Sequence, residues 1–398
     1  MESPRILGIV LAALLVAGCQ PASSQAAPSQ PAPTIPSTLP TPSGLAPTVS
    51  VSASQRPWPA GKTVALPPSY RFHSMSSEGP LAVLDEIASA DDGLQSDVVL
   101  VDLAHGTWKI LARAVAGYHP WNPVISGDNV AWEEWKYSGG SIVGDCDWRI
   151  VALSLNSGRS RVLASGRDTR RWAGNASCPA FDLDGGQLAY SVENTSPGRP
   201  FGWLVKIVDI STGHLVRTVA TAEQINYFAF WNGSVAYTEG TVDQAGGVVY
   251  DTRLMLSTPG VPQPVQIDSG AYVVSFRGGR LAWTADAGAS QGGSGVALGQ
   301  RAWTAIGPSW TPTPVTADAP PSGVDQVWPS ASSNSVCFTK MAYSGAGTMD
   351  VWIWDRQSGS SDLVPGSEGG LLCGQGGGWV DWAGGIGESV TVSGLVAP

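Results

Sequence analysis

The stretch Gly127-Asp-Asn-Val130-Ala131-Trp132 joins a tight turn to the start of a strand, and its pattern recurs along the chain. The triplet has an apolar residue, then a small residue, then an aromatic or apolar residue. It returns at spacings from the low forties to the high fifties, at Leu81–Val83, Val130–Trp132, Leu188–Tyr190, Val235–Tyr237, Leu281–Trp283 and Val336–Phe338. A degenerate seventh copy is Val380-Asp381-Trp382. Most copies follow an Asp-Gly, Asn-Gly or Gly-Gly pair or a similar turn pair, which supplies the positive φ that a tight hairpin needs.

Each triplet is followed by two more strand patterns joined by a second turn. One example is Val98–Asp102, the turn His105-Gly106 and then Trp108–Leu111. Each unit therefore consists of strand A, a tight turn, strand B, a longer loop, strand C, a tight turn and strand D. A four-stranded unit of about 40–50 residues, repeated six or seven times, is typical of a β-propeller. The sequence predicts an all-β fold with four-stranded antiparallel blades.

The last unit decides the number of blades. Residues 378–382 and 389–392 give only inner and middle strands, and Thr63–Leu66, far away in the sequence, is a candidate for the missing outer strand. Closure of the ring through both ends of the domain favours seven blades, with six as the alternative. Length alone suggests two or three domains, and a two-domain arrangement remains a further alternative.

The turns resemble those of TolB-like and WD40-like (PD40-type) propeller repeats of envelope proteins. An Asp-x-x-x-Gly turn between strands C and D is present in Asp102–Gly106, Asp209–Gly213 and Asp355–Gly359, and the turn before strand B is best kept in Asp182–Gln187. The resemblance extends over nearly all of the chain after residue 60. It implies the propeller fold and an architectural role in an envelope complex.

The composition excludes several classes of protein. Of the 398 residues only 14% are charged, against about 25% in an average soluble domain. The net charge is −10 and there is no basic run, so we expect no nucleic-acid partner. No apolar stretch reaches the roughly 18–20 residues of a membrane-spanning helix. The 49 Gly, 30 Pro and 17 Trp instead suit a turn-rich β protein.

The first residues have the pattern of an export signal. Arg5 precedes the short apolar run Ile6–Ala17, and Leu15-Val-Ala-Gly-Cys19 resembles the lipobox of bacterial lipoproteins. The resemblance implies a signal peptide over 1–18, lipidation of Cys19 and an extracytoplasmic domain anchored to the cell membrane or outer membrane. An ordinary signal peptide with a cysteine at its cleavage site is the alternative. The type of envelope stays open.

Residues 19–59 have the composition of a tether. Gln20–Gln55 contains no charged residue and is rich in Pro, Ser, Ala and Thr, a composition that cannot bury a core. Proline favours the extended polyproline II conformation, which gives the segment a reach of roughly 100 Å. A proline-rich recognition ligand is the alternative. The propeller is then assigned to 60–398.

The loops point to one face for binding. The B–C loops are long and rich in glycine, and in a propeller they emerge on the same face as the D–A loops, where variable loops carry recognition. Asp85, Glu134, Glu239 and Lys340 share one register after their triplets. Aromatic and acidic side chains near this face are candidates for a glycan, peptide or protein ligand: His119, Trp121, Glu134, Tyr227, Glu239 and Trp328. The competing interpretation is that the aromatics pack between blades and the acids are solvated.

Signals for catalysis are weak. Gly288–Gly292 matches the G-x-S-x-G motif around Ser290, but all four histidines precede it, so the Ser…Asp…His order of that motif cannot be formed. Asp91–Asp97 lacks the full ligand pattern of a calcium loop. We predict no catalytic residue, no metal and no cofactor. The leading hypothesis is a binding or scaffolding module for a protein, peptide or envelope glycan, and the alternative is a glycan hydrolase or lyase that uses carboxylates at the channel mouth.

Four cysteines besides Cys19 suit disulfides in an exported chain. Cys146 opens strand C of one unit and Cys178 opens strand A of the next, so we pair these two. The remaining pair, Cys337–Cys373, also comes from neighbouring units.

Overall fold

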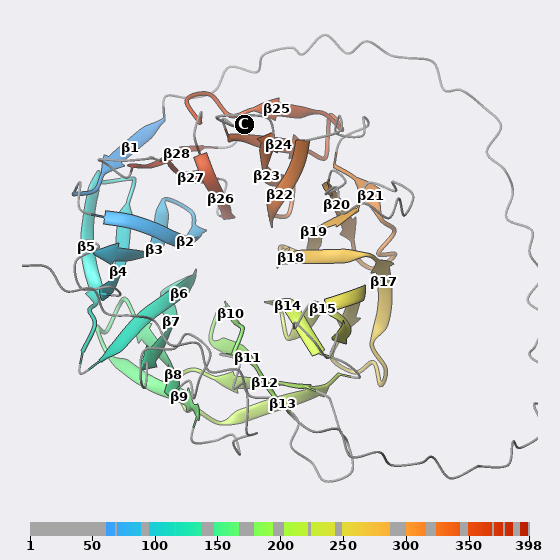
Figure 1. The fold of residues 1–398 in the computed structure, drawn as a ribbon, viewed down its shortest axis with the longest axis horizontal. Coiled ribbons are helices and arrows are strands. Elements are labelled where there is room, and N and C mark those ends of the chain that lie inside the picture. Colours follow the sequence, from blue (N-terminus) through green and yellow to red (C-terminus); the bar gives the residue numbers. More distant parts are fainter. Residues whose placement is uncertain are drawn as a thin grey trace, which may run out of the picture. The chain divides into compact units, whose positions relative to one another are not determined.

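The computed structural model describes one ring of β-strands, all of it within the compact unit Ala53–Pro398 (Figure 1). The described residues are 61–67, 70–88, 95–115, 117–136, 147–166, 179–193, 203–221, 224–242, 249–286, 300–315, 324–342, 349–367, 370–376, 379–384 and 391–396. They form seven four-stranded antiparallel sheets, which are the blades of a propeller. The predicted all-β fold with seven blades is confirmed. Within these ranges no helix is long and apolar enough to cross a membrane.

Each blade begins with its innermost strand, next to the centre of the ring, and continues outward. Blade 1 contains β2 (Tyr70–Glu78), β3 (Leu81–Ala88), β4 (Gln95–Asp102) and β5 (Thr107–Ala112). Blade 2 contains β6 (Tyr118–Ser126), β7 (Asn129–Lys136), β8 (Asp147–Ser154) and β9 (Ser160–Ser165). Blade 3 contains β10 (Phe181–Asp184), β11 (Gln187–Glu193), β12 (Trp203–Asp209) and β13 (Leu215–Ala220). Blade 4 contains β14 (Gln224–Trp231), β15 (Ser234–Val242), β16 (Val249–Ser257) and β17 (Val265–Ser269).

The remaining three blades complete the circle. Blade 5 contains β18 (Ala271–Arg277), β19 (Arg280–Asp286), β20 (Gln300–Ile306) and β21 (Thr313–Pro314). Blade 6 contains β22 (Val324–Ala331), β23 (Ser335–Ala342), β24 (Asp350–Asp355) and β25 (Ser361–Leu363). Blade 7 contains β26 (Gly370–Gly376), β27 (Trp379–Gly384), β28 (Thr391–Val396) and, as its outer strand, β1 (Lys62–Ala65).

The triplets lie on the second strand of each blade, as the turn pairs before them predict. In blade 4, Asn232 and Gly233 have φ angles of 47° and 73°, and the turn places Val235 opposite Phe230. The small second residue is fully buried in each triplet, at Ala82, Ala131, Ala189, Ala236, Ala282, Cys337 and Asp381. A small side chain lets adjacent sheets approach, and the larger third residue fills the space where they diverge.

The Asp-x-x-x-Gly segments form the second tight turn through side-chain hydrogen bonds. The Asp209 carboxylate accepts bonds from the Thr212 N–H at 2.8 Å and the Ser211 hydroxyl at 2.7 Å. Gly213 has φ +74° and donates its N–H to the Asp209 carbonyl at 2.7 Å. The bonds to the carboxylate lower the pKa of Asp209 to about 2, and the bond from the Ser211 hydroxyl has the largest effect. His105 and His214 are exposed beside such turns.

The ring is closed by a strand from the beginning of the domain. β1 pairs antiparallel with β28, with Val64 opposite Val392, so the predicted contribution of residues 63–66 to the last blade is confirmed. The prediction for the inner strand of this blade is wrong, however. The inner strand is β26, and the strands containing 379–382 and 391–392 are the second and third of the blade. The run Gly370–Gly376 is hard to recognise because three of its seven residues are glycine and it lacks a clear apolar alternation.

The hydrophobic core is distributed between the blades. One cluster joins blades 7 and 1 and includes Val64, Leu84, Val101 and Val392. Arg280, fully buried, crosses from blade 5 to blade 6, where it donates to the Ser332 and Ser333 carbonyls at 3.0 and 3.1 Å.

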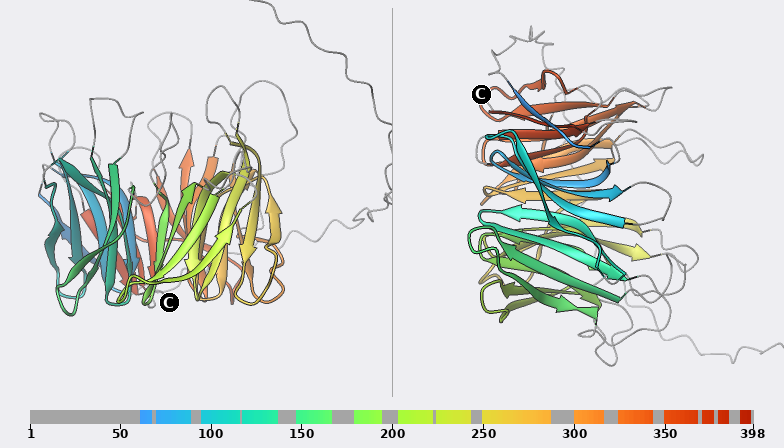
Figure 2. Two further views of the ribbon diagram at one scale, coloured as in Figure 1. Left: turned by 90° about the horizontal axis from the view of Figure 1, so that it is seen from below. Right: turned by 90° about the vertical axis from the view of Figure 1, so that its left-hand side faces the viewer.

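Figure 2 shows the described hairpin turns along one end of the ring. We call this the turn end, and the opposite end, where the B–C and D–A connections start, the loop end.

Candidate functional site

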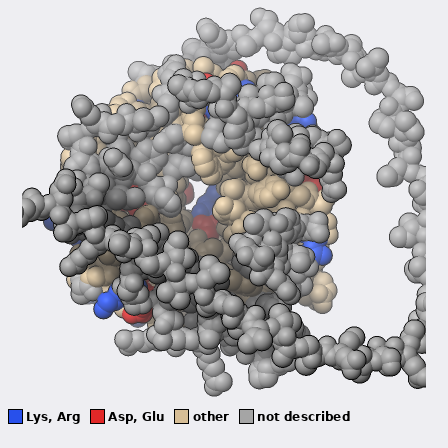
Figure 3. Space-filling view, in the orientation of Figure 1, with Lys and Arg blue, Asp and Glu red and all other residues tan. Residues whose placement is uncertain are grey.

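The innermost strands surround the centre of the ring (Figure 1), where the space-filling view shows an opening that we call the channel (Figure 3). These strands are β2, β6, β10, β14, β18, β22 and β26. In six of these strands the pairing with the second strand is interrupted by a bulge, β10 being the regular one. A bulge interrupts the alternation of side chains between the two faces of a strand. The bulges therefore change the direction of side chains on the inner strands, next to the channel.

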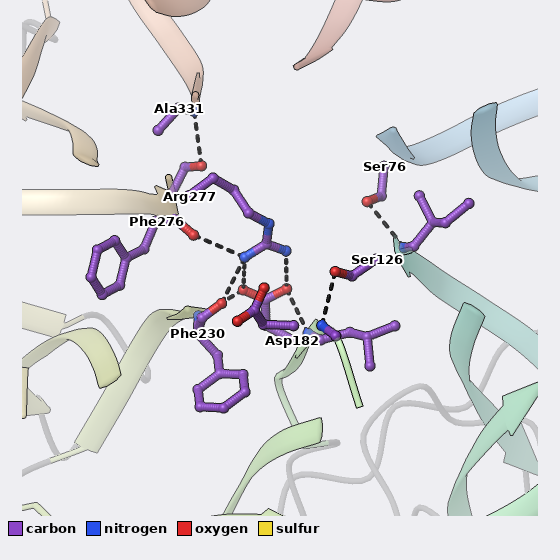
Figure 4. Close-up of polar contacts among 12 residues, drawn as sticks. Ser76, Ser126, Asp182, Phe230, Phe276, Arg277 and Ala331 are labelled. Atoms are coloured by element: carbon purple, nitrogen blue, oxygen red, sulfur yellow. Dashed lines mark hydrogen bonds and ion pairs between the residues drawn. The ribbon is translucent and has the colours of Figure 1, made fainter. Parts of the chain in front are cut away.

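A buried ion pair crosses the turn end of the channel. Arg277 on β18 donates to both carboxylate oxygens of Asp182 on β10, at 2.6 and 3.0 Å, and to the Phe230 carbonyl at 2.7 Å (Figure 4). Asp182 also accepts the Phe230 N–H at 2.7 Å. Three blades, of which blades 3 and 5 are not adjacent, are therefore tied together by one guanidinium group. The side chains of Arg277 and Asp182 are only 21% and 11% exposed.

Two more acids lie within electrostatic reach of this pair. Burial alone would lower the pKa of the Arg277 guanidinium, but Asp182, Asp184 and Glu78 outweigh it and raise the pKa. Burial raises the pKa of Glu78, an effect that Arg277 partly offsets and Asp184 reinforces. The central opening in Figure 3 contains side chains of both signs. The turn end of the channel is thus polar, and both terminal nitrogens of Arg277 donate hydrogen bonds.

Hydrogen bonds between neighbouring inner strands complete this end of the ring. The Ser76 hydroxyl accepts the Ile125 N–H at 3.3 Å, the Ser126 hydroxyl accepts the Gly185 N–H at 3.0 Å, and Ser275 does the same for Ala331 at 3.1 Å (Figure 4). These contacts join blade 1 to 2, blade 2 to 3 and blade 5 to 6. They fix the inner strands relative to one another, which makes the channel a rigid scaffold.

Halfway along the channel the chemistry changes to exposed aromatic groups. Tyr227 on β14 is 44% exposed and Trp328 on β22 is 39% exposed. Tyr227 lies opposite Thr238, and Trp328 lies in the bulge directly after Val327, which is opposite Thr339. Thr238 and Thr339 hold the same place after the first triplet residue, so Tyr227 and Trp328 are one residue apart in register on blades 4 and 6. Because blades cover both faces of an inner strand, its mid-strand side chains reach solvent through the channel. Two of the predicted binding residues therefore share one level of the channel.

Trp328 adopts an unusual backbone conformation. Its φ is +48°, in the left-handed region that costs a bulky residue of order 1–2 kcal/mol. Asn122 holds the equivalent position of blade 2, also with φ +48°, and its N–H is bound by the buried Asp85 carboxylate at 3.0 Å. Asparagine adopts this backbone conformation at little cost in energy, whereas tryptophan is strained in it. Strain of this kind is typical of functional positions.

The predicted acids Glu134 and Glu239 are engaged in ion pairs. Both are buried, and each lies opposite an arginine of the third strand of its own blade. Glu134 binds Arg149 and the Trp132 indole N–H, the latter at 2.9 Å, and Glu239 binds Arg253 at 3.2 Å. Lys340, which shares this register, places its Nζ atom 3.4 Å from the centre of the Trp352 ring. Glu134 and Glu239 are therefore buried and paired with arginine, not solvated as the competing interpretation expected.

His119 and Trp121 lie on one face of blade 2 with a second glutamate. His119 pairs with Trp135 and Trp121 pairs with Glu133 across β6 and β7, and the Trp121 and Trp135 rings stack at 5.6 Å. Glu133 is 1% exposed, and burial raises its pKa well above the usual range, with a smaller opposing effect of Trp135. Burial lowers the pKa of His119. The cluster therefore favours a protonated acid beside a neutral imidazole.

Sequence reasoning missed Glu133, Asp182, Arg277 and Glu78. Glu133 and Glu134 are consecutive, so a strand sends them to opposite faces, and only the tertiary structure shows that Glu133 lies beside Trp121 while Glu134 meets Arg149. Asp182 belonged to a recognised turn motif, but its partner is 95 residues away. Nothing local in the sequence marks that contact.

One of the two predicted disulfides is present. Cys337 on β23 and Cys373 on β26 form a disulfide with their Cα atoms 6.3 Å apart, which joins blades 6 and 7. The other predictions on Cys19, Cys146 and Cys178 lie outside the described residues, as does Ser290. Among the described residues no group of three or more His, Cys, Asp or Glu side chains could hold a metal ion.

No family model and no curated protein matches the chain. The β-propeller domain of the Trilobed protease from Pyrococcus furiosus matches 80% of this chain and 90% of its own, with TM-score 0.54 and 9% identity. Oligogalacturonate lyase in complex with manganese matches 85% and 98%, with TM-score 0.51 and 10% identity. Pyrococcus horikoshii acylaminoacyl peptidase matches 79% of this chain, with TM-score 0.54 and 11% identity. This chain spans about half of that peptidase, 49% of its length. The likeness establishes the fold, a β-propeller, which peptidase domains and a lyase share.

Proposed function

We propose that the protein is a lipid-anchored, extracytoplasmic β-propeller of the TolB-like kind that binds a protein, peptide or envelope glycan. The ligand is received at the loop end of the channel. Anchoring rests on the lipobox-like Leu15–Cys19, and the TolB-like assignment rests on the Asp-x-x-x-Gly turns. The tether 19–59 holds the propeller away from the lipid surface.

One observation carries the binding role: the channel presents exposed Tyr227 and Trp328 at one level, with Trp328 held in a strained conformation. Aromatic faces with a polar edge bind sugar rings and peptide side chains by stacking and hydrogen bonding. The acids Glu134 and Glu239 are neutralised by Arg149 and Arg253. This arrangement supports recognition through stacking more than acid–base chemistry.

The binding role is tested by affinity capture from native envelope and by a glycan array. We expect the double variant Tyr227→Ala/Trp328→Ala to lose the captured partner or the bound glycan. Trp108→Ala is the matched control, because Trp108 is 36% exposed but lies on the outer strand β5. Equal retention of the ligand by both variants would exclude the channel aromatics as the binding site.

The anchor is tested by metabolic labelling with a palmitate analogue. The wild-type chain should take up the label and partition with membranes, and Cys19→Ala should do neither. Labelling of Cys19→Ala at the wild-type level would contradict lipidation at this residue. A loss of labelling with retained ligand capture would leave the binding role intact.

The alternative, a glycan hydrolase or lyase, is favoured by one observation. A general acid must hold its proton at neutral pH, and burial of Glu133 beside Trp121 has that effect. If the protein cleaves glycans, Glu133→Gln should abolish release of new sugar ends. Glu134→Gln, on the opposite face of the strand, should keep it. Cleavage by Glu133→Gln at the wild-type rate would contradict this role.

A further inference from the structure

The seam between blade 7 and blade 1 contains a carboxyl group where most other blades have alanine. Asp381 is the second residue of the degenerate triplet, and it is 0% exposed. Neither of its carboxylate oxygens has a hydrogen-bond partner among the described residues. The seam is also the place where the ring closes, because β1 joins blade 7 from the beginning of the domain.

Two glycines make room for this carboxyl group. Gly374 on β26 and Gly394 on β28 are the direct neighbours of Asp381 in the sheet. A Cβ atom on Gly394 would overlap the Asp381 carboxylate and Leu103, and one on Gly374 would overlap the Ser77 hydroxyl. Leu103 and Ser77 belong to blade 1. The acid is therefore packed against blade 1.

The charged groups around this position are directed elsewhere. β26 and β28 contain no charged residue. Glu78 on β2 interacts with Arg277, and Asp102 at the end of β4 binds His105. Asp85 on β3 accepts the Ser74 and Asn122 N–H groups, and Lys62 on β1 donates to the Ala104 carbonyl. No cation among these groups compensates a charge on Asp381.

We propose that Asp381 is a proton-controlled latch: blade 7 packs onto blade 1 only while this carboxyl group is protonated. An ionised carboxylate without a partner is strongly disfavoured in an apolar interior. Burial accordingly raises the pKa of Asp381 well above the usual range, and the nearby Ser77 hydroxyl opposes this only partly. The disulfide Cys337–Cys373 holds the other side of blade 7 to blade 6. Loss of the proton therefore loosens the seam with blade 1 in preference to the seam with blade 6.

The sign of the pH dependence follows from the raised pKa. The closed seam binds the proton more tightly than the open one, so closure is favoured at low pH. Between the ordinary aspartate pKa and the raised value, the equilibrium constant for opening should increase about tenfold per pH unit, and it should level off above. The latch is independent of the ligand proposed for the loop end.

Hydrogen exchange of the full-length protein from pH 5 to pH 9, corrected for the intrinsic rate, tests the latch. Amides of β26–β28 and β1 should lose protection with rising pH relative to those of β15 in blade 4. Asp381→Asn, which keeps the shape without the charge, and Asp381→Ala, the residue of five other blades, should abolish this dependence. Glu133→Gln should keep it, because Glu133 is in blade 2.

Two results would overturn the proposal. One is a wild-type seam whose corrected protection does not change with pH, which can be measured even if a variant fails to fold. The other is a pH dependence that persists unchanged in Asp381→Ala.

Discussion

Replacement of Arg277 by methionine tests the ion pair that crosses the channel. The change removes two hydrogen bonds to Asp182 and those to the Phe230 and Phe276 carbonyls. It leaves the Asp182 carboxylate with the N–H groups of Leu183 and Phe230. Breaking one partner of a buried pair costs about 3–5 kcal/mol. Because Asp182 keeps two donors, we expect the lower value, about 3 kcal/mol.

Urea unfolding followed by tryptophan fluorescence measures this loss. Arg161→Met is the matched control, since Arg161 is exposed and donates to the Ser211 carbonyl; we expect less than about 0.5 kcal/mol. The double variant Asp182→Leu/Arg277→Met should recover part of the loss because no charge is left buried. A cost below about 1 kcal/mol for Arg277→Met, or strict additivity in the double variant, would refute the assigned role.

Three further substitutions follow from the packing. Trp328→Asn should change the free energy of unfolding by less than about 1 kcal/mol, because asparagine accepts φ +48° and the lost side chain is 39% exposed. A urea titration that gives a loss above about 2 kcal/mol would mean that Trp328 is a packing residue. Removal of the Cys337–Cys373 disulfide by alanine substitution should cost about 3–4 kcal/mol, and an unchanged urea midpoint would contradict its contribution. Val64→Asp should cost more than about 3 kcal/mol of unfolding free energy, because Val64 is 5% exposed in the seam. Ala65→Asp, on the exposed face of the same strand, should not. Equal unfolding midpoints for these two variants would argue against the closing role of β1.

The sequence was sufficient for the fold because the repeat is local. The turn pair, the small second residue and the following strands occur within one unit, and their period of two is visible without a partner. Even the closing strand was found, since Thr63–Leu66 is an apolar-alternating segment left over by the repeats. The inner strand of blade 7 was not found, because glycines at 370, 374 and 376 remove the alternation of apolar and polar residues that marks a strand.

The candidate site was predicted less well. The register of Glu134 and Glu239 was visible in the sequence, but the arginines that neutralise them are set by the pairing of the second and third strands across long loops. Tyr227 and Trp328 were selected as aromatic residues near the loop end. That they share one level of the channel follows from register in two separate blades.

The amino-acid sequence by itself determined the repeated unit and the all-β class, because each depends on patterns that are complete within a few tens of residues. It also indicated the closing strand, as the strand segment that the repeats left over. Only the tertiary structure decided that Arg277 reaches Asp182, that Glu133 rather than Glu134 lies beside Trp121, and that Asp381 faces blade 1. The physical reason is that burial and charge pairing between blades depend on which faces meet when the circle closes. No single unit contains that information.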